Sequence, residues 1–365
     1  MKIFFTIGGL SGSGGIDRVV AILSDYFCKC GNDVVIHLIG ARFDFSTRAN
    51  IVYYVGNNRC RLTKIISEFL CILKIRKVIE RENPDVIYNT CWAVPFFGFL
   101  KKGKILSAIH WDPRKELKHV NWKLRFLTRF LRFSAATVVP TQSLKGVLEK
   151  QFRFKNVIAI PNPVDFSAIS NQLNALTLLD SLLGSSYILA VGRLDVDKNF
   201  ALLIRAFALT AAKNKVELLI IGEGVLREEL QVLISSIKLD SRVHLLGAQS
   251  NVFAYMAHCL FFVSSSSVET FSMVLAEALA CGVAVISTDI DGPRDFISHG
   301  ENGLLVKNNG LREMAEAIDK LYFDVQLRNK LASSAKKSVA KLSIENIALL
   351  YQKVFDNIYF DNCTL

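Results

Sequence analysis

Residues 264–294 read SSSSVETFSMVLAEALACGVAVISTDIDGPR, and this stretch decides the fold of the chain. It begins at the end of an apolar strand, FFVSSSS, and apolar residues then recur at helical spacing from Ser272 to Ala280. Gly282 ends the predicted helix, and VAVIST forms a second apolar strand. This order predicts a parallel sheet, whose ligands bind beyond the carboxyl ends of its strands.

Two acidic residues fall where such a sheet binds its ligand. Glu269 lies in the loop after the first strand, and Glu277 lies in the first turns of the helix. A carboxylate accepts two hydrogen bonds, which suits the paired hydroxyl groups of a sugar or a ribose. Alternatively, Glu277 faces solvent and Glu269 caps the helix. The free backbone N–H groups at the helix start would bind a phosphate, and they belong to Phe271, Ser272, Met273 and Val274.

The two acids form an E-x7-E pattern that resembles the signature of retaining glycosyltransferase family 4. The segment EALACGVAVI, from Glu277 onward, and the later Gly292-Pro293 continue that pattern. Ser272 stands where the family usually has Gly, and we expect its hydroxyl group to cap the helix. The resemblance implies the α/β GT-B fold, in which two Rossmann-like domains face each other across a cleft.

A second segment, YILAVGRLDVDK at residues 187–198, supplies two cations. Arg193 and Lys198 lie in a polar loop after the predicted strand, where they would bind a diphosphate beside the helix start. Gly192, Arg193 and Lys198 also resemble the family segment G-R-x4-K, which implies the same role. Surface cations are common, so this prediction depends on their combination with the E-x7-E pattern.

The first half of the chain contributes two further candidate residues. Residues 11–18, SGSGGIDR, form a Gly-rich loop that lets a ligand approach the backbone, although an ordinary flexible loop has the same composition. The loop resembles the family's Gly-Gly-x-Glu-Arg, with Asp17 in place of Glu, so Gly15 is assigned to donor binding. His110 ends the predicted strand ILSAIH, where the family has a histidine beside the donor sugar; a lone histidine is more often structural.

The excess positive charge is confined to the first half of the chain. Residues 1–165 contain 26 Lys and Arg against 12 Asp and Glu, a net charge of +14, whereas the remaining residues have a net charge of −3. Residues 111–133 interleave seven of these cations with aromatic residues, which favours an anionic membrane surface. A core helix with a solvated basic face is the alternative. Nucleic acid is disfavoured, because no nucleic-acid-binding motif accompanies the charge.

The length of 365 residues predicts two domains. The family resemblance implies that residues 1–165 bind the acceptor and residues 166–345 bind the nucleotide-sugar, and we expect a helix at 346–365 to return toward the first domain. No apolar run approaches the ~18 residues needed to span a bilayer. The apolar segment at the N-terminus is too short for an export signal. We therefore expect a cytoplasmic protein, peripheral on the inner face of the cell membrane, with reduced cysteines.

Two D-x-D triplets, Asp195-Val-Asp197 and Asp289-Ile-Asp291, raise the question of a metal ion. Because cations already lie beside the predicted diphosphate site, we expect metal-independent chemistry and no cofactor. The family resemblance implies two substrates: a nucleotide-sugar, most simply a UDP-hexose or UDP-N-acetylhexosamine, and a lipid-linked saccharide or glycan acceptor of surface polysaccharide or lipopolysaccharide synthesis. The predicted catalytic residues are Glu269, Arg193, Lys198 and His110, and the predicted donor-binding residues are Glu277, Gly15, Gly222 and Phe271 to Val274.

Two other classes of protein are also compatible with the sequence. A nucleotide-sugar epimerase or hydrolase on the same fold would release a soluble product from the donor alone. A membrane- or nucleic-acid-binding module without catalysis would still bind its partner after loss of Glu269 and Arg193.

Overall fold

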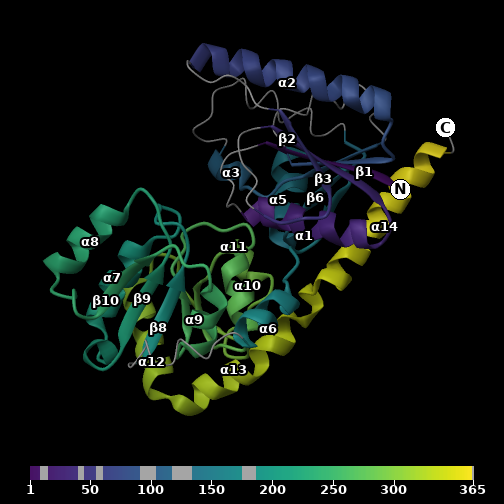
Figure 1. Ribbon diagram of the computed structural model, residues 1–365. Helices are drawn as coiled ribbons and strands as arrows, with labels where there is room; N and C mark the ends of the chain where they lie inside the picture. Colours follow the sequence, from purple (N-terminus) through teal and green to yellow (C-terminus); the bar gives the residue numbers. More distant parts are fainter. Residues whose placement is uncertain are drawn as a thin grey trace. The chain divides into compact units, whose positions relative to one another are not determined.

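The computed structural model describes residues 1–8, 15–39, 45–54, 61–90, 104–116, 134–174 and 186–363. The chain divides into two compact units, Met1–Pro163 with Ile344–Leu365, and Val164–Ser343. Each unit contains one parallel β-sheet flanked by helices, so the predicted α/β architecture is confirmed (Figure 1). The Gly-rich residues 9–14 and most of the basic segment, residues 117–133, lie outside the described part of the chain.

The sheet of the first unit has the strand order β3-β2-β1-β4-β5-β6-β7, and every adjacent pair is parallel. Strand β1 is apolar from Ile3 to Ile7 apart from Thr6, because both of its faces are covered. The strands are β1 Lys2–Gly8, β2 Asp33–Ile39, β3 Asn50–Tyr54, β4 Val86–Asn89, β5 Ile105–Ala108, β6 Ala136–Val139 and β7 Val157–Ala159.

The last helix of the chain belongs to the first unit. Helix α14 packs against α1 and β4, and the rings of Phe27 and Phe355 lie 5.1 Å apart between α1 and α14. The described helices of this unit are α1 Gly15–Lys29, α2 Arg61–Glu82, α3 Pro113–Glu116, α5 Gln142–Phe152 and α14 Ile344–Cys363.

The sheet of the second unit has the order β10-β9-β8-β11-β12-β13 and is also parallel throughout. Its apolar strands pack with α7 and α12 into one core that includes Ile188, Leu218 and Ile286. The strands are β8 Tyr187–Val191, β9 Glu217–Ile221, β10 Val243–Gly247, β11 Phe262–Ser264, β12 Val285–Thr288 and β13 Leu304–Val306.

The stretch that opened the sequence analysis forms β11, α10 and β12, as predicted. The helix begins at Met273, one residue after the predicted start at Ser272. The α-helices of this unit are α6 Phe166–Asn174, α7 Phe200–Leu209, α8 Arg227–Ser236, α9 Val252–His258, α10 Met273–Ala280, α11 Asp291–Arg294, α12 Leu311–Phe323 and α13 Val325–Val339, and the 3-10 helices are Ala212–Asn214 and Ala340–Leu342.

The strand order of the second sheet reverses at β8. Strands β9 and β10 lie on one side of β8, whereas β11, β12 and β13 lie on the other. The loops after β8 and β11 therefore start from adjacent strand ends at the carboxyl edge, where ligands of such sheets bind. No helix in the described part of the chain is long and apolar enough to cross a membrane.

His37 is a buried titratable group in the first sheet. Its Nδ1 atom lies 3.0 Å from the hydroxyl group of Tyr54, and its ring packs 4.5 Å from that of Phe4. Burial lowers the pKa of His37 to about 4, because the charged imidazolium would lose its hydration. The folded protein therefore holds His37 neutral over most of the pH range.

We predict that His37 makes the protein less stable as the pH falls. Above about pH 6.5 the histidine is neutral in both states, whereas between about 6.5 and 4 only the unfolded chain takes up the proton. The free energy of unfolding should then fall by about 1.4 kcal/mol per pH unit through this group. Denaturant titrations of His37→Asn at several pH values should show a smaller slope of the unfolding free energy against pH. Phe27→Leu, which lowers stability at a buried ring packed on Phe355, should keep the wild-type slope. Equal slopes in all three proteins would contradict the prediction.

Candidate functional site

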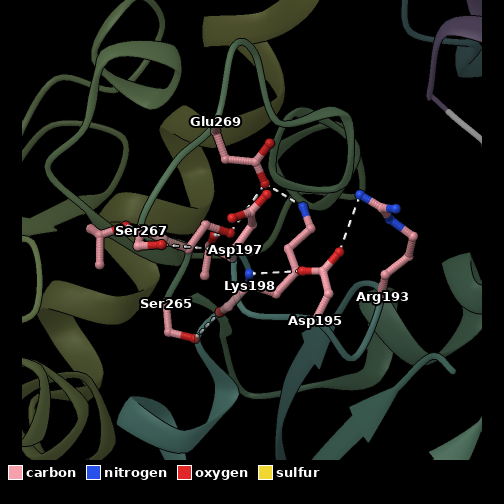
Figure 2. A network of polar contacts seen from close by, with 10 residues as sticks. Arg193, Asp195, Asp197, Lys198, Ser265, Ser267 and Glu269 are labelled. Carbon is pink, nitrogen blue, oxygen red and sulfur yellow. Dashed lines mark hydrogen bonds and ion pairs between the residues drawn. The ribbon is translucent and has the colours of Figure 1, made fainter. Parts of the chain in front are cut away.

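An ion pair between Lys198 and Glu269 forms the centre of the site. Lys198 Nζ contacts Glu269 Oε1, and Figure 2 shows the two side chains pointing toward each other. Lys198 comes from the loop after β8 and Glu269 from the loop after β11, so the pairing of these two strands brings them together. The side chains are only 18% and 14% exposed. Shielding from water makes the attraction stronger than that of a surface pair.

Hydroxyl groups hold both members of this pair. Ser266 Oγ donates to Glu269 Oε1 at 3.1 Å, and Ser265 Oγ donates to the backbone oxygen of Lys198 at 2.9 Å. Thr288 Oγ1, at the end of β12, donates to the backbone oxygen of Ser266 at 2.5 Å. All three hydroxyl residues are buried. The loops after β8, β11 and β12 are therefore joined into one network around the ion pair.

Arg193 lies beside this network and remains accessible. Its guanidinium group pairs with Asp195 at 3.1 Å, and the Arg193 side chain is 72% exposed. Asp195 also accepts a hydrogen bond from the backbone N–H of Lys198 at 3.1 Å, as Figure 2 shows. Since an exposed ion pair is weak, Arg193 can exchange Asp195 for an anionic ligand.

The two D-x-D triplets are engaged in other contacts. Asp195 pairs with Arg193, and Asp289 pairs with Arg294. The backbone oxygen of Asp197 accepts hydrogen bonds from Ser267, at 2.7 Å from its N–H and 3.3 Å from its hydroxyl group. Among the described residues, no group of three or more potential ligands could hold a metal ion.

Gly222 shapes the site through the backbone. It has φ +143°, and a Cβ atom there would lie 1.9 Å from the backbone oxygen of Gly192. Only glycine therefore allows the turn after β9 to approach the loop that carries Arg193 and Lys198. The structure shows this packing role; a contact between Gly222 and a ligand stays a prediction.

Ser272 does not cap helix α10 with its side chain, so that expectation was wrong. The residue has φ +72° and ψ +77°, and its hydroxyl group makes no capping hydrogen bond. A capping serine normally has extended backbone angles, from which its oxygen reaches the N–H groups of the first turn. The left-handed conformation redirects the side chain, and Ser272 Oγ is buried with no hydrogen-bond partner among the described residues. Such a backbone favours glycine.

The start of α10 nevertheless offers backbone donors. The first hydrogen bond back to Ser272 comes from the N–H of Ala276 at 3.3 Å. The N–H groups of Met273 and Val274 precede it and have no acceptor within the helix. Gly292 packs against the loop that precedes α10. A Cβ atom on Gly292 would lie 2.8 Å from the backbone nitrogen of Phe271. The loop between Glu269 and the helix is thus held closely by the turn after β12.

Glu277 lies in α10 and is 3% exposed, so the alternative that it faces solvent is wrong. The pKa of the Cys281 thiol is raised to about 12, first by burial and then by the negative charge of Glu277. A contact between Glu277 and a ribose stays a prediction.

His110 and Gly15 both belong to the first unit. His110 follows β5, and its Nε2 atom lies 3.4 Å from the hydroxyl group of Tyr88. Tyr88 lies 3.4 Å from the hydroxyl group of Tyr351 on α14. Burial lowers the pKa of His110 to about 4, so its imidazole is neutral at neutral pH. Gly15 is the exposed first residue of α1.

No sequence pattern singled out the three hydroxyl residues that hold the ion pair. Ser265 and Ser266 occupy the run SSSS after β11, which was interpreted only as a polar turn. Thr288 is 22 residues away from Ser266 in the sequence. The serine run was the only available signal, and it does not reveal which side chains point into the network.

Two family models match the sequence, one in each half. The model described as "Glycosyl transferases group 1" matches residues 181–338, and the model described as "Glycosyltransferase Family 4" matches residues 13–168. The C-terminal match contains every residue of the ion-pair network.

Individual proteins agree with these matches. A Campylobacter jejuni protein named N-acetylgalactosamine-N,N'-diacetylbacillosaminyl-diphospho-undecaprenol 4-alpha-N-acetylgalactosaminyltransferase is 38% identical over 232 residues, covering 62% of this chain and 62% of that protein. An uncharacterized glycosyltransferase of Methanocaldococcus jannaschii is 31% identical over 303 residues, covering 80% of this chain and 81% of that protein. The crystal structure of Anabaena Alr3699/HepE in complex with UDP-glucose has a TM-score of 0.81 at 18% identity, covering 98% and 100% of the two chains, and therefore shares the fold.

We predict that Ser272→Gly stabilises the protein by about 1 kcal/mol, because glycine adopts the left-handed conformation without strain. The substitution also removes a buried hydroxyl group. Chemical denaturation measures the change. The matched control is Ser333→Gly at an exposed position within helix α13, where the same substitution should cost about 0.5 kcal/mol. Destabilisation by both substitutions would show that the backbone at Ser272 is not strained.

Proposed function

The chain belongs to glycosyltransferase family 4, and on this basis we propose that it is a retaining, metal-independent transferase that moves a sugar from a UDP-sugar to a lipid-linked saccharide or glycan. Its product would be a cell-surface polysaccharide or lipopolysaccharide. The observation that carries the proposal is the shielded Lys198–Glu269 pair, which lies with Arg193 at the carboxyl edge of the second sheet.

The relatives support the substrates of this proposal. The Campylobacter protein is named for the transfer of N-acetylgalactosamine to a saccharide on diphospho-undecaprenol, which is a lipid-linked acceptor. The Anabaena protein, which shares the fold, was crystallised with UDP-glucose. A UDP-linked hexose or N-acetylhexosamine is therefore the donor that we propose.

Stabilisation of the leaving group is the first task of the site. As the sugar departs, negative charge develops on the diphosphate. Lys198 and Arg193 would contact this charge together with the backbone N–H groups at the start of α10. Two side-chain cations and a helix terminus supply the charge that a metal ion provides in other transferases, so we propose that no metal and no cofactor take part.

The remaining predicted residues would position the donor. Glu277 would accept the ribose hydroxyl groups, and Glu269 would accept those of the sugar as it gains positive charge. His110 would contact the sugar as a neutral imidazole, consistent with its lowered pKa. Retention of configuration follows from the family; we propose departure and attack on the same face of the sugar, assisted by the diphosphate. In this proposal the second unit binds the donor and the first binds the acceptor.

A thermal-shift screen of nucleotide-sugars tests the donor directly. A ligand that binds only the folded protein raises the apparent stability according to its concentration and affinity. UDP-sugars should raise the midpoint, and transfer should require an added acceptor. Release of a soluble sugar product from the donor alone would instead indicate an epimerase or a hydrolase.

We predict that Lys198→Ala and Arg193→Ala each lower the turnover number about 10²–10³-fold, because each removes a cation from the leaving diphosphate. Turnover is measured at saturating donor, with unfolding curves to establish that the variants fold. The matched control is Arg205→Ala, which removes an exposed cation from α7 of the same unit. Near-normal turnover in either site variant would refute the assignment of the diphosphate site.

We predict that the basic first half binds anionic membranes. The net charge of +14 in residues 1–165 motivates this, together with the cations and aromatic residues of 111–133. Co-sedimentation with anionic vesicles should fall as the Debye length shortens from about 10 Å at 0.1 M salt to about 3 Å at 1 M. Reversing the charge of Arg125, Arg129 and Arg132 should abolish binding to the anionic vesicles. Reversing three exposed lysines of α13, Lys330, Lys336 and Lys337, is the control. Equal binding to neutral vesicles would favour a soluble acceptor.

A further inference from the structure

We propose that Glu269 also selects against the free nucleoside diphosphate, so that the product leaves the site more readily than the donor. This inference rests on the proposed function, because it requires the diphosphate to bind at Lys198. It assigns Glu269 a second role, as a specificity residue between a nucleotide-sugar and its own nucleotide product.

Glu269 and the diphosphate would share one ammonium group. Lys198 Nζ contacts Glu269 Oε1, and both side chains are largely shielded from water. An anion bound to Lys198 must therefore lie close to the Glu269 carboxylate. Repulsion between two anions at such a separation is strong wherever water is largely excluded.

The carboxylate is held against Lys198. Ser266 Oγ donates to the same oxygen of Glu269 at 3.1 Å, and Ser266 is buried. The backbone of Ser266 is in turn held by Thr288 at 2.5 Å. Since the hydrogen bond to Ser266 would be lost if Glu269 rotated away, an approaching anion meets the carboxylate in place.

The donor and the product differ in charge at this point. In the donor, the β-phosphate is esterified to the sugar and carries one negative charge. During transfer, the bond between the anomeric carbon and the β-phosphate oxygen breaks, and its electron pair remains on that oxygen. The acceptor hydroxyl group passes its proton to the departing β-phosphate oxygen as it bonds to the sugar, and at pH 8 the phosphate releases that proton to water. The released β-phosphate has a second ionisable oxygen with a pKa near 6, so at pH 8 it carries a second charge.

The Glu269 carboxylate responds to this difference in opposite ways. With the donor bound, it accepts hydrogen bonds from the sugar. With the product bound, no hydroxyl groups face it, and the additional charge of the β-phosphate lies close to it. The affinity for the product is therefore lowered by the residue that favours the donor.

Titration calorimetry with UDP and UMP tests this inference without a turnover measurement. At pH 8, Glu269→Gln should bind UDP about tenfold more tightly than wild type, because the repulsion is removed. UMP affinity should be unchanged, because UMP has no β-phosphate. At pH 5.5 the gain for UDP should shrink, because the β-phosphate takes up a proton.

Two further variants keep the test decisive. Glu269→Ala serves if Glu269→Gln fails to fold. It also removes the negative charge, so it should likewise raise the affinity for UDP. Glu217→Gln is the matched control, because Glu217 pairs with His244 at 3.5 Å and lies at the opposite, amino end of β9. It should bind UDP as wild type does.

The possible failures are distinguishable. If wild type binds UDP but neither Glu269 variant binds it more tightly, the inference is wrong and the proposed function stands. If the variants tighten UMP as much as UDP, the β-phosphate is not the group that Glu269 repels, and the inference is again wrong. If neither wild type nor either Glu269 variant binds UDP, the proposed UDP-linked donor itself is refuted.

Discussion

The shielded ion pair between Lys198 and Glu269 is the interaction on which the functional interpretation depends. The two residues are 71 positions apart in the sequence, and they meet only because β8 and β11 are adjacent strands. A parallel sheet places the carboxyl ends of adjacent strands at one edge, where ligands of such sheets bind. The topology of the sheet thus determines which cation meets which carboxylate.

The neighbourhood of the pair shows how the site is kept in place. Buried polar groups require partners, and the serine run after β11 supplies hydroxyl donors to both sides of the ion pair. Gly222 and Gly292 permit close backbone approaches that any Cβ atom would prevent. Rigid loops of this kind favour catalysis, because donors already aimed at developing charge need no rearrangement.

The first unit also places a candidate site residue after the carboxyl end of a parallel strand. His110 lies at the carboxyl end of β5, and burial keeps its imidazole neutral. Its neighbour Tyr88 lies close to Tyr351 of the C-terminal helix, which returns from the end of the chain to pack on this unit. The end of the chain therefore contributes to the surroundings of a residue from its first third.

The sequence by itself determined the alternation of strands and helices, because apolar periodicity and glycine stops are local signals. It also determined the candidate cations and carboxylates, since Arg193, Lys198, Glu269 and Glu277 lie in recognisable patterns. The left-handed backbone of Ser272, the burial of Glu277 and the hydrogen bonds from Ser265, Ser266 and Thr288 were decided only by the tertiary structure. Each depends on neighbours that are remote in sequence, and a backbone angle or a hydrogen-bond partner is fixed by packing rather than by residue type.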